Sequence, residues 1–226
     1  MRRILFVLIV GLGGMAILVS LGLWQVRRLD WKEGVIAAIE ARLAAEPVDL
    51  AGLTQPDPEA LNYQAVTTAG RTTGAELVVL SAIKGQGAGY RIISAFETDA
   101  GRRIMLDRGF VPEGDRRADR PAADLTVIGN LMWPEDADAF TPPPDRDEGL
   151  WFARDVPSMS EALNTDPVLV VVRRVAGPDQ GILPQPVTTA GIPNDHFGYA
   201  VTWFSLAAVW AGMTGFFLWR ISRRTS

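Results

Sequence analysis

The residues best suited to chemistry lie near the C-terminal end, in the run NDHFGYAVTWF, residues 194–204. The run contains the only histidine of the chain, His196, followed by Tyr199 and Trp203. The spacing i, i+3, i+7 puts these three side chains on one face of a helix. A neutral imidazole is a common axial ligand of haem iron, and aromatic rings offer apolar surface against which a porphyrin can pack. One interpretation of this face is therefore a haem site with His196 as the iron ligand.

A second group of candidate residues lies where the N-terminal apolar run ends. Trp24 and Gln25 leave that run, and Arg27 and Arg28 follow directly. In an antiparallel pair of spans, Trp24 and Gln25 lie at the depth of His196. Under the haem interpretation, Trp24 closes the site, and Arg27 or Arg28 contacts the haem propionates. The residues alone favour a different interpretation, an aromatic belt with an interfacial histidine, because such belts are common in membrane proteins.

Composition excludes several other kinds of site. The chain has no cysteine, which excludes disulfides, zinc–thiolate sites, iron–sulfur clusters and cysteine nucleophiles. A single histidine excludes most hydrolytic triads and multi-histidine metal sites. We therefore expect no catalytic residue and no enzymatic turnover. If His196 binds haem iron, the second axial ligand is open, with Met132, Met159 and Tyr199 as candidates.

Two long apolar runs must position these residues. They extend from Ile4 to Leu23 and from Phe197 to Leu218, and a hydrocarbon core about 30 Å thick requires roughly 20 apolar residues in a helix. The sequence predicts a membrane protein with transmembrane helices at 4–24 and 197–219. These helices flank one mostly antiparallel β domain of the α+β class, residues 30–193, on a single side of the membrane.

Positive charge near the ends of the spans predicts the orientation. Five arginines lie outside the apolar runs at the two ends of the chain: Arg2, Arg3, Arg220, Arg223 and Arg224. This places both termini in the cytoplasm and the central domain in the periplasm. The first run is longer than a signal-peptide core and lacks a small-x-small cleavage site, so we expect an uncleaved anchor in a bacterial inner membrane. The net charge of −4 implies −9 for the rest of the chain, and an acidic domain does not attract nucleic acid.

The central region has the alternating, β-branched composition of strands. Asp30–Leu43 and Ser158–Asn164 read as helices, and 134–149 reads as a polar loop. GQGAG (85–89) is followed by a strand, which favours a hairpin turn over a phosphate loop. The strands are predicted at 63–71, 76–83, 89–98, 102–111, 124–133 and 167–175, and turns such as TDAGR predict antiparallel hairpins.

Two smaller patterns carry structural predictions. In LDRGFVP (106–112), Asp107 and Arg108 beside Gly109 predict a local salt bridge and a glycine-dependent turn at a strand end. The pairs Ala208–Gly212 and Ala211–Gly215 are small-xxx-small motifs, which predict close contact between the two spans.

The two end motifs together resemble a known family. LGLWQVRRLDWK (21–32) and NDHFGYAVTWFSLA (194–207) are similar to the N- and C-terminal signatures of the surfeit-locus cytochrome c oxidase assembly factors, the family that includes the yeast Shy protein. GYRIISAF (89–96) and RRIMLDRGFVP (102–112) resemble the family's central strands. The resemblance covers nearly the whole chain.

This resemblance implies a function in the assembly of haem–copper cytochrome c oxidase. The cofactor it implies is haem A, which in bacterial members is attributed to the histidine that corresponds to His196. The implied partners are the largest oxidase subunit, haem A synthase and the lipid bilayer, and the oligomeric state stays open, a homo-oligomer included. The alternative is a cofactor-free membrane scaffold that holds oxidase subunits or haem-synthesis enzymes together, with the His196 region as an interfacial anchor.

Overall fold

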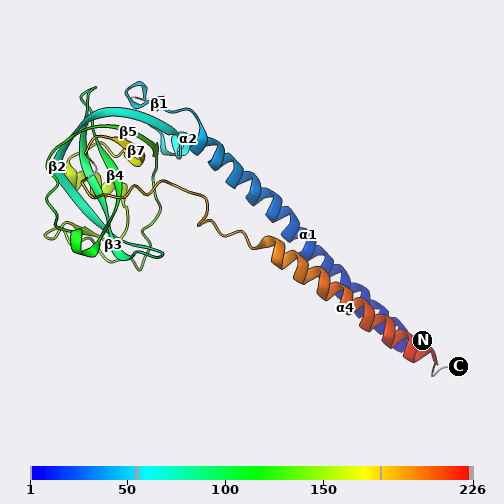
Figure 1. Ribbon diagram of the computed structural model, residues 1–226. Coiled ribbons are helices and arrows are strands. Elements are labelled where there is room, and N and C mark those ends of the chain that lie inside the picture. Colours follow the sequence, from blue (N-terminus) through cyan, green and yellow to red (C-terminus); the bar gives the residue numbers. More distant parts are fainter. Residues whose placement is uncertain (1, 54–55, 179, 224–226) are drawn as a thin grey trace. The chain divides into compact units, whose positions relative to one another are not determined.

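A computed structural model describes residues 2–53, 56–178 and 180–223 (Figure 1). These residues form two compact units. The helical unit contains the residues up to Ala38 and those from Thr189 onward, and the β unit contains Ile39–Thr188. Two candidate membrane helices at the ends of the chain thus flank a sheet-rich domain, which confirms the predicted fold class.

Two helices build the helical unit: α1 (Arg2–Ala44) and α4 (His196–Arg223), shown in blue and orange in Figure 1. Both are long and apolar enough to cross a membrane. At 1.5 Å per residue, the 43 residues of α1 span about 64 Å, so this helix is far longer than a hydrocarbon core. Its last part includes the segment 30–43, which confirms the predicted helix there. The predicted membrane boundaries, 4–24 and 197–219, stay predictions.

The two helices pack along a contact surface, here called the helix seam. Its members are the less exposed residues at steps of three and four along each helix, as in a coiled coil. They are Val7, Gly11, Gly14, Leu18, Gly22 and Gln25 of α1, and His196, Ala200, Trp203, Ala207, Trp210 and Thr214 of α4.

Glycines of α1 allow this close packing. A Cβ at Gly14 would overlap the indole ring of Trp210, and one at Gly22 would overlap the ring of Phe204. The Trp210 indole N–H also donates a 2.9 Å hydrogen bond to the Gly11 carbonyl. The prediction of close helix contact is confirmed, but its motif was wrong, because Cβ atoms at Gly212 and Gly215 would meet only open space.

Seven strands form the β unit: β1 (Val48–Asp49), β2 (Ala65–Ile83), β3 (Gly87–Thr98), β4 (Arg103–Pro112), β5 (Asp124–Leu131), β6 (Leu150–Trp151) and β7 (Leu169–Ala176). The sheet runs in the order β1-β2-β3-β4-β7-β5, and β5 pairs again with β2, which closes a barrel. Pairing between β4 and β7 is parallel, and the other barrel pairs are antiparallel. Short helices, α2 (Pro58–Leu61) and α3 (Val156–Leu163), and 3₁₀ turns at Leu50–Gly52 and Glu113–Asp115 complete the unit.

Strand β2 differs from its prediction. The runs 63–71 and 76–83 were expected as separate strands, but they form one strand of 19 residues. Its register against β3 shifts between Thr72 and Glu76. The glycine and polar residues of this stretch therefore mark a bulge, a device that bends a strand without ending it. The bend lets the first half of β2 pair with β5 and the second half with β3. The predicted hairpins at 85–89 and at TDAGR are confirmed.

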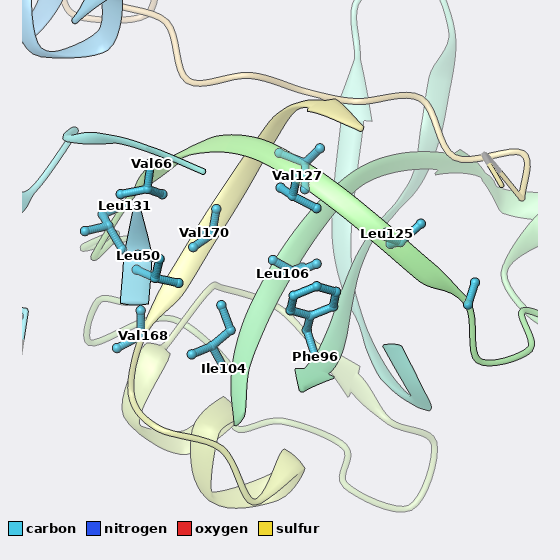
Figure 2. Packing of buried hydrophobic residues seen from close by; sticks show 12 residues of the cluster. Leu50, Val66, Phe96, Ile104, Leu106, Leu125, Val127, Leu131, Val168 and Val170 are labelled. Atoms are coloured by element: carbon cyan, nitrogen blue, oxygen red, sulfur yellow. The ribbon is translucent and has the colours of Figure 1, made fainter. Parts of the chain in front are cut away.

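The barrel interior is packed with branched and aromatic side chains (Figure 2). Alternate residues of β4, Ile104 and Leu106, lie in this cluster with Phe96 of β3, all without solvent exposure. Met105, between them, belongs instead to a second cluster that includes Met159 of α3. The barrel thus has one core inside and a second core under α3. The bounds of α3 are close to those of the helix predicted at 158–164.

The motif around Asp107 is not the predicted strand end. Gly109 lies within β4, where a register shift against β3 leaves Arg108 as the bulged residue. Its φ of +125° and the approach of the Leu183 carbonyl leave no room for a side chain. The Phe110 and Leu183 backbones exchange two hydrogen bonds of 2.8 and 2.9 Å, so the bulge ties the segment that leads to α4 onto the barrel.

Asp107 forms distant ion pairs rather than the expected local one. Its side chain is fully buried, and it accepts hydrogen bonds from Arg91 Nε at 2.8 Å and from Arg154 Nη1 at 3.4 Å. Burial opposes the charge on Arg154, but its bonds to Asp136 and Asp107 outweigh this and raise the pKa of Arg154. Arg108, the predicted partner, instead donates to Gln180 at 2.7 Å.

Candidate functional site

The site begins at the first residue of α4, His196, after an extended segment of the chain. Asn194 and Asp195 precede the helix, and short polar residues of this kind favour helix starts. Asp195 also places a carboxylate near the positive end of the helix dipole, which stabilises this terminus. The Tyr199 backbone N–H donates to the Asp195 carbonyl at 3.3 Å, so the first turn is formed at the site.

His196 is held by a residue of the other helix. Its Nδ1 lies 2.7 Å from Oε1 of Gln25, and Gln25 is only 8% exposed. An amide oxygen can only accept a hydrogen bond, so Nδ1 carries the proton and donates it. In a neutral imidazole, Nε2 is then the unprotonated nitrogen. Within the described part of the chain, no hydrogen bond to Nε2 is found. The predicted proximity of Gln25 to His196 is therefore confirmed.

The three predicted aromatic residues are placed differently. Trp203 belongs to the helix seam and is half-buried, whereas Tyr199 is 57% exposed and Trp24 is 51% exposed. The next residue of the helix seam after His196 is Ala200, four positions on, because Ala200 is the buried residue of that turn. Tyr199 thus flanks the seam rather than lying in it.

Helix geometry puts Tyr199 and Trp24 on the same side of the hairpin. Successive residues turn by about 100° around a helix, and the Gln25–His196 and Gly22–Phe204 contacts fix which sides face each other. Tyr199 and Trp24 then lie at similar depth on one side of the hairpin, and Phe204 lies on the other side.

The two arginines occupy different faces of α1. Arg28 lies on the same side of the hairpin as Trp24, and its guanidinium stacks over the Trp31 ring at 4.4 Å from the centroid. Arg27 is two residues beyond Gln25, about 200° around the helix, and so points away from the seam. Both side chains are exposed. The structure therefore brings Arg28, and not Arg27, to the side that carries Trp24.

The residues present fit haem better than a bare metal ion. Among residues 2–53, 56–178 and 180–223, no group of three or more His, Cys, Asp or Glu side chains is placed to hold a metal ion. A lone imidazole can serve only a metal that brings its other ligands with it, as haem iron does with its pyrrole nitrogens. A neutral Nε2 beside exposed Tyr199 and Trp24 has the chemistry for this ligand.

Two of the three candidates for a second axial ligand lie in the β unit. Met159 is fully buried in the core under α3, so it is not available as a ligand. The Met132 sulfur lies 4.0 Å from Arg154 Nη1. Tyr199 lies one turn from His196 on the same helix and is 57% exposed.

Sequence reasoning placed Gln25 at the right depth but did not assign it a role. The signal was available in the step of seven residues along α1 from Leu18 to Gln25, both of which occupy the helix seam. A polar residue in a seam of apolar and small residues needs a hydrogen-bond partner. The only histidine of the chain is such a partner.

Comparison with known proteins gives a consistent match. The model of the SURF1 family matches residues 12–208, a range that contains both ends of the helix seam contact between Gln25 and His196. A "SURF1-like protein" of Monosiga brevicollis is 29% identical over 212 residues, covering 86% of this chain and 80% of its own. "Surfeit locus protein 1" of Rattus norvegicus is 27% identical (84% and 68% covered), and that of Homo sapiens is 28% identical (84% and 70% covered).

Proposed function

Because this chain belongs to the SURF1 family, we propose that it is an assembly factor for haem–copper cytochrome c oxidase that binds haem A through His196. The role in oxidase assembly is what family membership implies. The finer part of the proposal is that haem A is held at the membrane interface and passed to the largest oxidase subunit. The setting we propose is a bacterial inner membrane, with both termini cytoplasmic and the β unit periplasmic.

The observation that carries the haem proposal is the bond between His196 Nδ1 and Gln25 Oε1 at 2.7 Å. It leaves Nε2 as a neutral nitrogen donor at the end of a transmembrane hairpin, where an apolar macrocycle can stay in contact with lipid. Haem would supply an iron that accepts a neutral imidazole nitrogen as ligand. Tyr199 and Trp24 offer apolar contact surface on one side, and Arg28 offers a cation for a propionate.

Holding and transfer of haem require no bond to be made or broken in the porphyrin. We therefore propose no enzymatic activity for this chain. Trp203 acts through the helix seam, where its ring keeps the hairpin packed beneath His196. Arg27 points away from the helix seam and is therefore less well placed than Arg28 to bind a propionate.

The test is the absorption spectrum of the detergent-purified full chain, produced together with haem A synthesis. Wild type, His196→Ala and a control, Thr202→Ala, are compared. Thr202 lies on the same helix and is exposed, and its hydroxyl donates to the Gly198 carbonyl at 2.9 Å. We expect a haem A spectrum in wild type and in the control, and its loss or a shifted band in His196→Ala. Equal spectra in all three proteins would refute His196 as the ligand.

A specific observation favours the scaffold as second candidate. Phe140, within the acidic loop 134–149 of the β unit, is 92% exposed. The Asp138 carboxylate accepts hydrogen bonds from the Phe140 backbone N–H at 2.9 Å and from Thr141 Oγ1 at 3.0 Å, which orders this turn. A scaffold would use such a residue to contact a protein partner. Phe140→Ala would then impair oxidase assembly, whereas His196→Ala would not.

A further inference from the structure

We propose that Gln25 is a positioning residue for haem: it sets the tautomer and ring orientation of His196, so that Nε2 is presented as the iron ligand. This inference rests on the proposed function and deepens it. The contact joins two residues 171 positions apart, one on each helix of the hairpin. The role is therefore a property of helix packing rather than of the His196 motif itself.

The first step of the argument is the direction of the hydrogen bond. A neutral imidazole has one protonated and one unprotonated nitrogen, and the partner of one nitrogen decides the state of the other. With Gln25 Oε1 as acceptor, the Nδ1–H tautomer is favoured and Nε2 keeps its lone pair. If a donor stood in place of Oε1, the proton would move to Nε2, and Nε2 could not bind iron.

The second step is burial. Gln25 is 8% exposed, whereas its neighbours Trp24 and Val26 are exposed at 51% and 37%. Removal of the acceptor would leave the Nδ1–H without this partner, at a position where the 8% exposure of Gln25 leaves little room for water to replace the bond. The ring would then rotate or change tautomer, and either change reduces the fraction of protein that can bind iron.

The third step is the choice of an amide. Gln25 is 8% exposed, and a charge in a buried position is costly. Glutamine gives the accepting oxygen of a carboxylate without the charge. Outer partners of this kind, which accept the second N–H of a metal-bound histidine, typically change metal affinity by about 10- to 100-fold when they are removed.

The first measurement needs no haem. The chain has one histidine, so ¹⁵N-histidine labelling of the full protein in detergent gives one imidazole spin system, recorded at mildly alkaline pH. Wild type is expected to show the Nδ1–H tautomer. In Gln25→Leu, which keeps the volume and removes the acceptor, the Nε2–H tautomer should appear. Gln25→Glu, which restores an accepting oxygen, should return the signal toward wild type.

The second measurement is the haem A affinity of the same proteins, determined by titration of the purified chains. Gln25→Leu is expected to bind about 10- to 100-fold more weakly than wild type, and Gln25→Glu should recover most of the loss. A cysteine crosslink between positions 11 and 214 reports whether the hairpin still packs, because a Cβ at Gly11 would lie 3.2 Å from the Thr214 Cβ across the seam. The crosslink should form equally in all three proteins.

The outcomes separate the two proposals. If wild type binds haem A through His196, but Gln25→Leu has the same tautomer and affinity, Gln25 has no positioning role and the proposed function stands. If Gln25→Leu loses the crosslink as well, Gln25 acts on packing, and the inference is overturned. If wild type binds no haem A, the proposed function fails, and the inference fails with it.

Discussion

Replacement of Asp107 by asparagine should strongly destabilise the β unit. The Asp107 side chain has no solvent exposure, and its carboxylate faces two guanidinium groups, those of Arg91 and Arg154, which are 17% and 15% exposed. Asparagine keeps the volume and one accepting oxygen but removes the charge, so Arg154 keeps its ion pair with Asp136, whereas Arg91 loses its ion pair with Asp107. Removal of one partner from a buried ion pair costs about 3–5 kcal/mol. We expect the lower end of this range, because one hydrogen bond can persist.

A loss of about 3 kcal/mol corresponds to a fall in the midpoint of thermal unfolding of roughly 6–12 °C for a protein of this size. The measurement is thermal unfolding of the full chain in detergent, followed by near-ultraviolet circular dichroism, to which the buried Trp151 of the β unit contributes.

The matched control makes the same substitution in an exposed ion pair. Asp124 lies 2.9 Å from Arg71, and the two side chains are 80% and 57% exposed. Exposed pairs contribute about 0–1 kcal/mol, so Asp124→Asn should lower the midpoint by no more than about 4 °C. Equal shifts in the two variants would refute the argument that burial makes the Asp107 carboxylate indispensable.

Two further predictions concern the helix seam and a buried carboxylate. In this cysteine-free chain, Gly11→Cys with Thr214→Cys should form a disulfide, because a Cβ at position 11 would lie 3.2 Å from the Thr214 Cβ across the seam. The pair Gly13→Cys with Gly212→Cys, which faces open space, should not, and equal crosslinking would contradict the packing. Burial, partly offset by an adjacent guanidinium, raises the pKa of Glu76 above its ordinary value of 4.5. The folded state therefore holds this proton more tightly than the unfolded state, and the stabilisation is lost as pH rises through the folded pKa. The free energy of unfolding of wild type, relative to Glu76→Gln, should fall as pH rises above 4.5; a flat or rising difference would contradict the shift.

Features determined by local chemistry were predictable from the sequence. Apolar length identified both membrane helices, and glycine in 85–89 and TDAGR identified two hairpins. Depth along an antiparallel hairpin placed Gln25 near His196, since that argument needs only the rise per residue. Each of these predictions requires only a few residues, which are either close in the sequence or at the same depth along the two helices.

Features that depend on distant packing were not predictable. The predicted face contains Tyr199 at position i+3 from His196, whereas the observed helix seam contains Ala200 at position i+4. The position of α1 decides that Ala200 is buried in the seam and that Tyr199 is exposed. Asp107 forms ion pairs with Arg91 and Arg154, which are 16 and 47 residues away in the sequence, and not with its neighbour Arg108. The bulge in β2 and the parallel pairing of β4 with β7 likewise appear only when the barrel closes.

The closure of the barrel restricts how a partner protein can bind the β unit. An open sheet can capture an extended segment of another chain as an additional strand, through its unpaired backbone groups. In this barrel the ring of pairings returns from β5 to β2, and the strands outside the ring, β1 and β6, have only two residues each. These two short strands therefore offer few unpaired backbone N–H and C=O groups to an added strand. If the β unit binds a partner, as the scaffold proposal requires, side chains carried by loops must supply the contacts, and the specificity should respond to loop substitutions such as Phe140→Ala.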